Sequence, residues 1–101
     1  MDYKAMEAAR YAKAQEAYDK VPQGIKDDLH EALVWAKRTL TNYEGVGHHF
    51  ELSYDPARNG KPEGFVASFA KPQWNADHAS QPMPTAQEAI VMAVCEYLNG
   101  V

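Results

Sequence analysis

Residues 84–100 read PTAQEAIVMAVCEYLNG and contain the best-signalled helix of the chain. Thr85 followed three residues later by Glu88 is a capping box, which predicts that the helix begins there. Asn99 and Gly100 predict where it ends, because glycine tolerates the backbone conformation that closes a helix. The intervening residues that share one face are mostly apolar: Ala86, Ala89, Ile90, Ala93, Val94, Tyr97 and Leu98.

Two segments of alternating residues precede this helix. Residues 50–55 (FELSYD) and 64–71 (GFVASFAK) place apolar side chains at every second position, which is typical of half-buried strands. The intervening segment is rich in Pro, Gly, Asn and Asp, which predicts an antiparallel hairpin with a long loop. Residues 71–84 fit either a short third strand around 74–79 or an irregular loop.

Residues 2–20 and 25–43 predict two helices separated by a Pro/Gly turn. The second helix has the strongest apolar periodicity of the chain. The first is rich in alanine and charge, and its apolar stripe is narrow. Because an isolated helix of this kind is marginal in water, we expect it to pack on the second helix or on the same helix of another subunit. The stripe consists of Tyr11, Ala14, Tyr18 and Val21.

The order of these elements predicts an α+β fold. Two N-terminal helices, a small antiparallel sheet of two or three strands and a C-terminal helix would form α-β-α layers. The length fits a single domain over 1–101, with 1–44 as a helical hairpin and 47–99 as a ββ(β)α unit. The predicted core residues are Leu29, Leu33, Leu40, Phe50, Leu52, Phe65, Phe69, Ile90, Val94 and Leu98.

Composition argues against several classes of function. The chain has 10 Lys and Arg against 14 Asp and Glu, a formal net charge of −4. Binding to nucleic acid relies on neutralising phosphates, for which there is no basic surplus. The single cysteine forbids an internal disulfide and fits a reducing compartment. The chain contains no apolar run of about 20 residues and no apolar leader, so we expect a cytoplasmic protein without a membrane partner.

The histidines suggest metal chemistry but lack the spacing for it. His48 and His49 are neighbours on a predicted strand, so their side chains would point to opposite faces. A small metal-dependent hydrolase would need His49 together with Asp77 and His78. No zinc-ligand spacing connects these residues. We therefore predict no metal, no cofactor and no enzymatic activity.

The remaining reactive or aromatic residues favour contacts over catalysis. Cys95 lies within the apolar pattern of the last helix, where a free cysteine behaves as a small buried hydrophobe. Trp74 lies in a polar, Pro-rich stretch, where it would either cover the core or anchor a partner. The residues predicted to take part in interactions are Trp74, His78, His49, Tyr11 and Tyr18.

The hairpin segment GFVASFAK and the helix PTAQEAIVMAVCEYLNG resemble the phage ABA sandwich domain family, in which a strand hairpin is followed by an Ala-rich helix that begins with Pro/Thr. The resemblance spans residues 50–98. It implies a phage or prophage origin and an α-β-α layered domain. The family has no established activity, so the resemblance implies no site residues.

The predicted α-β-β-β-α order is also similar to that of double-stranded-RNA-binding domains. That family holds phosphates with lysines at the start of its last helix, whereas residues 85–88 here read TAQE.

Taken together, these features lead us to expect a non-enzymatic protein-binding module, and more specifically an inhibitor of a host protein. A nucleic-acid-binding domain and a small metal-dependent hydrolase are the alternatives. A homodimer is a further expectation.

Overall fold

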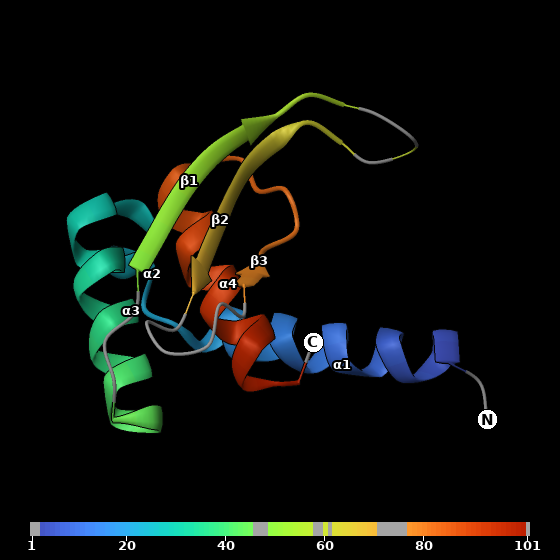
Figure 1. Ribbon diagram of the computed structural model, residues 1–101, viewed down its shortest axis with the longest axis horizontal. Coiled ribbons are helices and arrows are strands. Elements are labelled where there is room, and N and C mark those ends of the chain that lie inside the picture. The colour runs from blue at the N-terminus through green and yellow to red at the C-terminus, as the bar shows by residue number, and fades with distance from the viewer. Residues whose placement is uncertain (1–2, 46–48, 58–59, 61, 71–76, 101) are drawn as a thin grey trace.

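The computed structural model describes residues 3–45, 49–57, 60, 62–70 and 77–100 (Figure 1). The fold is α+β: among these residues, three helices come first in the chain, three strands follow, and a fourth helix comes last. The elements are α1 (Tyr3–Lys20), α2 (Gln23–Asp27), α3 (Leu29–Glu44), β1 (His49–Asp55), β2 (Gly64–Ala70), β3 (Asp77–Ala79) and α4 (Ala86–Leu98).

Asp28 divides the helical stretch predicted over 25–43 into two helices. Its backbone is extended, with φ −131° and ψ 124°, and its side chain accepts a hydrogen bond from the backbone N–H of Glu31 at 2.9 Å. A side chain that caps the next helix in this way interrupts the preceding one. The prediction of a single helix was therefore wrong at Asp28. The helix ends at Glu44, one residue beyond the predicted range, where Gly45 adopts the left-handed conformation at φ 74° and donates its N–H to the Thr41 carbonyl.

Thr85 begins α4 as predicted. Its hydroxyl oxygen accepts a hydrogen bond from the backbone N–H of Glu88 at 3.2 Å and donates to the Glu88 carboxylate at 2.7 Å. Asn99 ends the helix and donates its side-chain amide to the Cys95 carbonyl at 2.7 Å. Both ends of α4 are thus held by the residues that signal them in the sequence.

The predicted antiparallel hairpin is confirmed, with Phe50 opposite Phe69 and Tyr54 opposite Phe65. The short strand β3 pairs antiparallel with the other side of β2, where His78 lies opposite Phe69. The sheet order is therefore β1-β2-β3. Beyond β3, Met83 forms an isolated bridge to Phe65 and ties the segment before α4 to β2.

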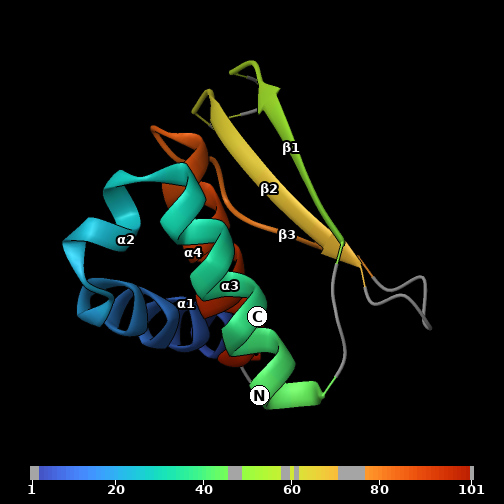
Figure 2. The ribbon, with the colours of Figure 1, turned by 90° about the vertical axis from the view of Figure 1, so that its left-hand side faces the viewer.

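The layers differ from the predicted α-β-α order. In the described residues α4 packs against β2 and β3, while α1, α2 and α3 pack against α4. Figure 2 shows the helices on one side of the sheet. The reason lies in α4 itself, in which every residue over 89–96 is buried. A helix that is almost entirely apolar over its central residues needs cover on all sides, so α1 packs on α4 and not on α3 as expected.

The core largely follows the predicted set. Leu40, Ile90 and Val94 are fully buried and Phe69 nearly so. Leu29 and Leu52 were predicted wrongly, because 42% and 44% of their surfaces are exposed. The predicted residues that are half-buried and pack against this core are Leu33, Phe50, Phe65 and Leu98. Small residues that the prediction omitted fill the centre: Ala14, Ala32, Ala36, Ala67, Ala89 and Ala93.

Candidate functional site

The outer edge of β1 is the most unusual feature of the sheet. β1 has seven residues, and in the described part of the chain it pairs only with β2, so its other edge carries no strand. Proteins usually protect such an edge with charged side chains (lysine above all), proline, a bulge or a short strand. The sequence HFELSYD contains no lysine or proline, its acidic residues are Glu51 and Asp55, and its pairing with β2 runs without a break. The opposite edge strand, β3, has only three residues.

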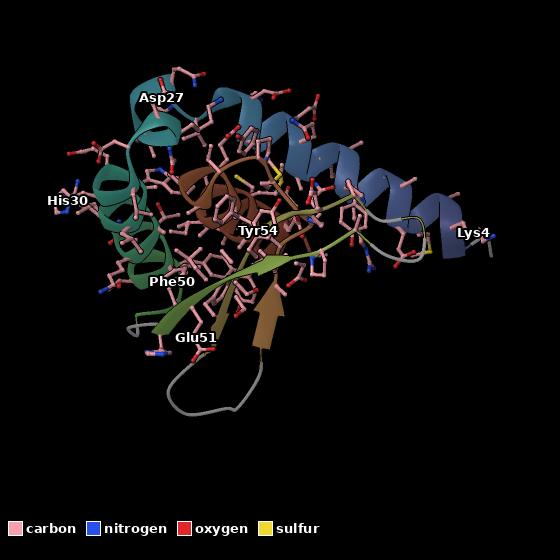
Figure 3. The ribbon with its side chains drawn as sticks, turned by 90° about the horizontal axis from the view of Figure 1, so that it is seen from above. Lys4, Asp27, His30, Phe50, Glu51 and Tyr54 are labelled. Atoms are coloured by element: carbon pink, nitrogen blue, oxygen red, sulfur yellow. The ribbon has the colours of Figure 1, made fainter. Side chains whose placement is uncertain are left out.

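Apolar side chains accompany this open edge. Phe50, Leu52 and Tyr54 share the face of the sheet on which the helices lie, and we call these three residues the β1 face. Figure 3 shows Phe50 and Tyr54 on the side of the helices and Glu51 on the other side. The helix α4 lies beneath β2, so Leu52 and Tyr54 extend beyond its cover and are 44% and 55% exposed.

Ring contacts hold the aromatic residues of the β1 face in place. The rings of Phe50 and Phe69 lie 5.4 Å apart, and those of Tyr54 and Phe65 lie 5.1 Å apart with an interplanar angle of 77°. A hydrogen bond to the Glu63 carboxylate raises the pKa of Tyr54. Aromatic side chains that are already ordered lose little conformational entropy on binding, which suits them to a contact surface.

Charged residues stand at the two ends of β1. His49 Nε2 lies 3.5 Å from Glu51 Oε1, and both side chains are largely exposed. At the other end, Asp55 accepts a hydrogen bond from the Ser53 hydroxyl at 3.4 Å. Even when the imidazole is protonated, an exposed ion pair of this kind contributes at most about 1 kcal/mol to stability, so His49 can change partners at small cost.

The structure separates the two tyrosines predicted to take part in interactions. Tyr18 is buried, and its hydroxyl donates a hydrogen bond to Glu88 Oε2 at 3.1 Å. Lys26 Nζ lies 4.7 Å from the centre of the Tyr18 ring and donates to the Tyr18 carbonyl at 3.2 Å. Burial and the Glu88 carboxylate raise the pKa of Tyr18 strongly. Tyr18 is therefore a core residue that joins α1, α2 and α4, and the prediction that it forms an interaction surface was wrong.

Tyr11, in contrast, lines a pocket of about 520 Å³ between α1, the hairpin and residues 79–82. Asp55 and Glu96 also line it, and Glu96 is buried with Oε2 accepting a hydrogen bond from the Gln81 N–H at 3.3 Å. Partial burial, helped by the charge of Glu96, raises the pKa of Tyr11. Two carboxylates at one pocket disfavour phosphates and other anions. Glu96 could not be identified as a site residue from the sequence, because a single acid within an apolar helix gives no signal of a site.

The structure places the remaining predicted residues apart from one another. His49 lies on β1, and Asp77 and His78 lie on β3, with β2 between the two strands. Among the described residues, no group of three or more His, Cys, Asp or Glu is positioned to hold a metal ion. Trp74 and His48 lie outside the described residues.

Cys95 is buried, as predicted, with 3% of its surface exposed. Burial raises the pKa of its thiol from 9.0 to about 12; Glu96 adds to this rise and Lys26 opposes it. Since the thiolate is the reactive form, this thiol is protected from chemical attack at neutral pH. Its setting is that of a packing residue.

We expect Cys95 to react with a thiol reagent near neutral pH only when the protein unfolds. In the folded chain the reagent cannot reach the buried sulfur, and the thiol does not ionise to the reactive thiolate. The measurement is labelling followed by mass spectrometry, with denatured protein as the control. The unfolded thiol ionises near 9.0 and the folded one near 12, so the contribution of the neutral thiol to stability is complete below pH 9.0 and is lost as the pH rises towards 12. Rapid stoichiometric labelling of the native chain would contradict this assignment.

None of the helices in the described residues is long and apolar enough to cross a membrane. No protein-family model matches the chain, and no curated protein or solved structure matches it either.

Proposed function

We propose that this chain is a non-enzymatic protein-binding module that docks through the outer edge of β1 and the β1 face. The observation that carries the proposal is the coincidence of an open strand of seven residues with the exposed side chains of Leu52 and Tyr54. A strand edge offers backbone N–H and C=O groups to an incoming extended segment, and adjacent apolar side chains select its sequence.

The chemistry of the surface describes the partner. An added strand would run beside β1 and present apolar side chains at alternate positions to the β1 face. Its remaining positions would face the same side as His49, Glu51 and Ser53. A phage or prophage origin, implied by the family resemblance, makes a host protein the first partner class to test, with inhibition of that protein as the sharper form of the proposal.

The nucleic-acid alternative has less support. The first turn of α4 carries Glu88 where a phosphate-binding surface would need lysine, and that carboxylate is already hydrogen-bonded to Thr85 and Tyr18. The pocket beside α1 is lined by Asp55 and Glu96, which repel phosphate. These charges favour a protein partner.

Photo-crosslinking tests the proposal directly. A photoreactive phenylalanine analogue is introduced at position 52 of the full chain, which is then expressed in bacterial cells and irradiated. Leu29 on α3 is a matched control, because its side chain is 42% exposed against 44% for Leu52. We expect a discrete cross-linked species from position 52 and not from position 29. Equal cross-linking at both positions, or none at position 52, would refute docking at β1.

A further inference from the structure

The sequence of β1 is complementary to itself. Written as His49-Phe-Glu-Leu-Ser-Tyr-Asp55, it has a basic residue at one end, an acidic residue at the other and Leu52 at its centre. We propose that the segment that docks on β1 is the β1 strand of a second copy of this chain. This inference rests on docking at the outer edge of β1, as in the proposed function, and puts a second copy of the chain in place of a host protein as the partner. Two sheets with the order β1-β2-β3 would join into one continuous sheet across a two-fold axis at Leu52.

Antiparallel pairing about Leu52 opposes compatible residues at every position. His49 lies opposite Asp55 of the second copy, which pairs opposite charges when the imidazole is protonated and a hydrogen-bond donor with a carboxylate when it is neutral. Phe50 lies opposite Tyr54 of the second copy, which is a favourable aromatic pair. Glu51 meets Ser53, and Leu52 meets its own equivalent. By symmetry, each unlike pair occurs twice.

Other registers are disfavoured by charge or by the pleat of the sheet. A shift of two residues in one direction places Glu51 opposite Glu51 of the second copy, and in the other direction it places Glu51 opposite Asp55. Like charges directly opposite each other destabilise a strand pair. A shift of one residue moves the β1 face of one copy to the opposite side from that of the other. Among the registers shifted by no more than two residues, only the one centred on Leu52 avoids both conflicts, and it also pairs all seven residues of the strand.

The pairing also covers the exposed part of the β1 face. Phe69 of β2 already contacts Phe50, and Phe65 contacts Tyr54. In the joined sheet, the row that begins with Phe69 and Phe50 continues into Tyr54 and Phe65 of the second copy. Leu52 would pack against its equivalent at the centre. Figure 2 shows β1 outermost in the sheet with the helices on one side, so the outer edge faces away from α4.

A cysteine at position 52 tests the two-fold axis. In this register the two copies of residue 52 lie opposite each other, within the Cα separation of about 4.4–6.8 Å that a disulfide requires. We expect Leu52→Cys to form a covalent dimer on mild oxidation of the purified chain. Ser53→Cys is the matched control, because residue 53 faces residue 51 of the second copy and not its own equivalent. Cys95 is buried in both variants and does not compete.

A charge exchange tests the register independently. His49→Asp opposes two carboxylates at both ends of the strand pair, and we expect it to raise the dimer dissociation constant by at least about tenfold in sedimentation analysis. The double variant His49→Asp/Asp55→His restores the opposite pairing and should restore the dimer. Circular dichroism of each variant establishes that the monomer remains folded.

The outcomes separate this inference from the proposed function. A purified wild type that stays monomeric up to about 1 mM, with no disulfide from Leu52→Cys, overturns the second copy as partner. If position 52 still cross-links to another protein in cells, docking at β1 stands. A dimer in which Ser53→Cys cross-links as readily as Leu52→Cys, or in which the double variant does not recover, overturns the register. Absence of both the dimer and the cellular cross-link refutes both proposals.

Discussion

Replacing Ile90 with alanine is expected to lower the free energy of unfolding by about 2–5 kcal/mol, the usual range when a large aliphatic side chain is removed from a core. Ile90 is fully buried in α4, the helix that contacts both the sheet and the other helices. The cavity would therefore lie at the junction of the layers, where no single element can move to fill it. Urea denaturation followed by circular dichroism measures the change, provided that the slope of the transition is unaltered.

Two leucines on α3 provide the controls for Ile90. Leu33 is half-buried against the core, so Leu33→Ala should lower the free energy of unfolding by less than Ile90→Ala does. The two losses would be similar only if both side chains were fully buried. Leu29 is 42% exposed, and Leu29→Ala should change stability by no more than about 0.5 kcal/mol. An equal loss of stability in all three variants would contradict the decrease in burial from Ile90 through Leu33 to Leu29.

The features that the sequence predicts well are those that neighbouring residues determine. Thr85 caps α4 and Gly45 ends α3 through hydrogen bonds to residues within one helical turn. The alternation in 50–55 and 64–71 likewise predicts the hairpin, because the two strands pair with each other. The break at Asp28 was not predicted, since aspartate stabilises a helix both within its first turn and as its N-cap, and the sequence 25–43 fits either role.

The order of the layers depends on residues that are distant in sequence, and here prediction failed. The α1 stripe needs an apolar partner, but nothing near α1 in the sequence shows that this partner is α4. A signal was nonetheless present in α4, where Val91, Met92 and Cys95 make the helix apolar beyond its main face. A helix that is apolar on all sides belongs in the middle of a domain.

Only part of the candidate site could be predicted, because the site also depends on contacts between residues that are distant in sequence. His49 was identified, and it lies at one end of the open edge. Leu52 was assigned to the core because alternation shows which side chains share a face, but not how far the covering helix extends over it. That extent depends on α4 lying beneath β2, which leaves the edge of the same face in solvent.

Gly64 begins β2 at a point where the chain has no space for a side chain. A Cβ atom added there would lie 2.8 Å from the carbonyl oxygen of Met83, 2.9 Å from its nitrogen and 3.0 Å from Pro82 Cβ. The same Met83 groups form the two hydrogen bonds of the bridge to Phe65, at 2.8 and 2.9 Å. Gly64→Ala must displace backbone, and we expect it to cost about 1–3 kcal/mol of stability, as overpacking does.

Gly24→Ala is the matched control, because it makes the same chemical change where there is room for it. Gly24 lies in α2, and apart from its chain neighbours and the helix backbone, no atom of the described residues lies within 4 Å of a Cβ built on it. An alanine there restricts the unfolded chain and suits a helix, so it should stabilise the protein by up to about 1 kcal/mol. Thermal unfolding of the two variants should therefore shift in opposite directions from the wild type. Shifts of the same sign and size would show that the segment before α4 is not held against β2 by the bridge between Phe65 and Met83.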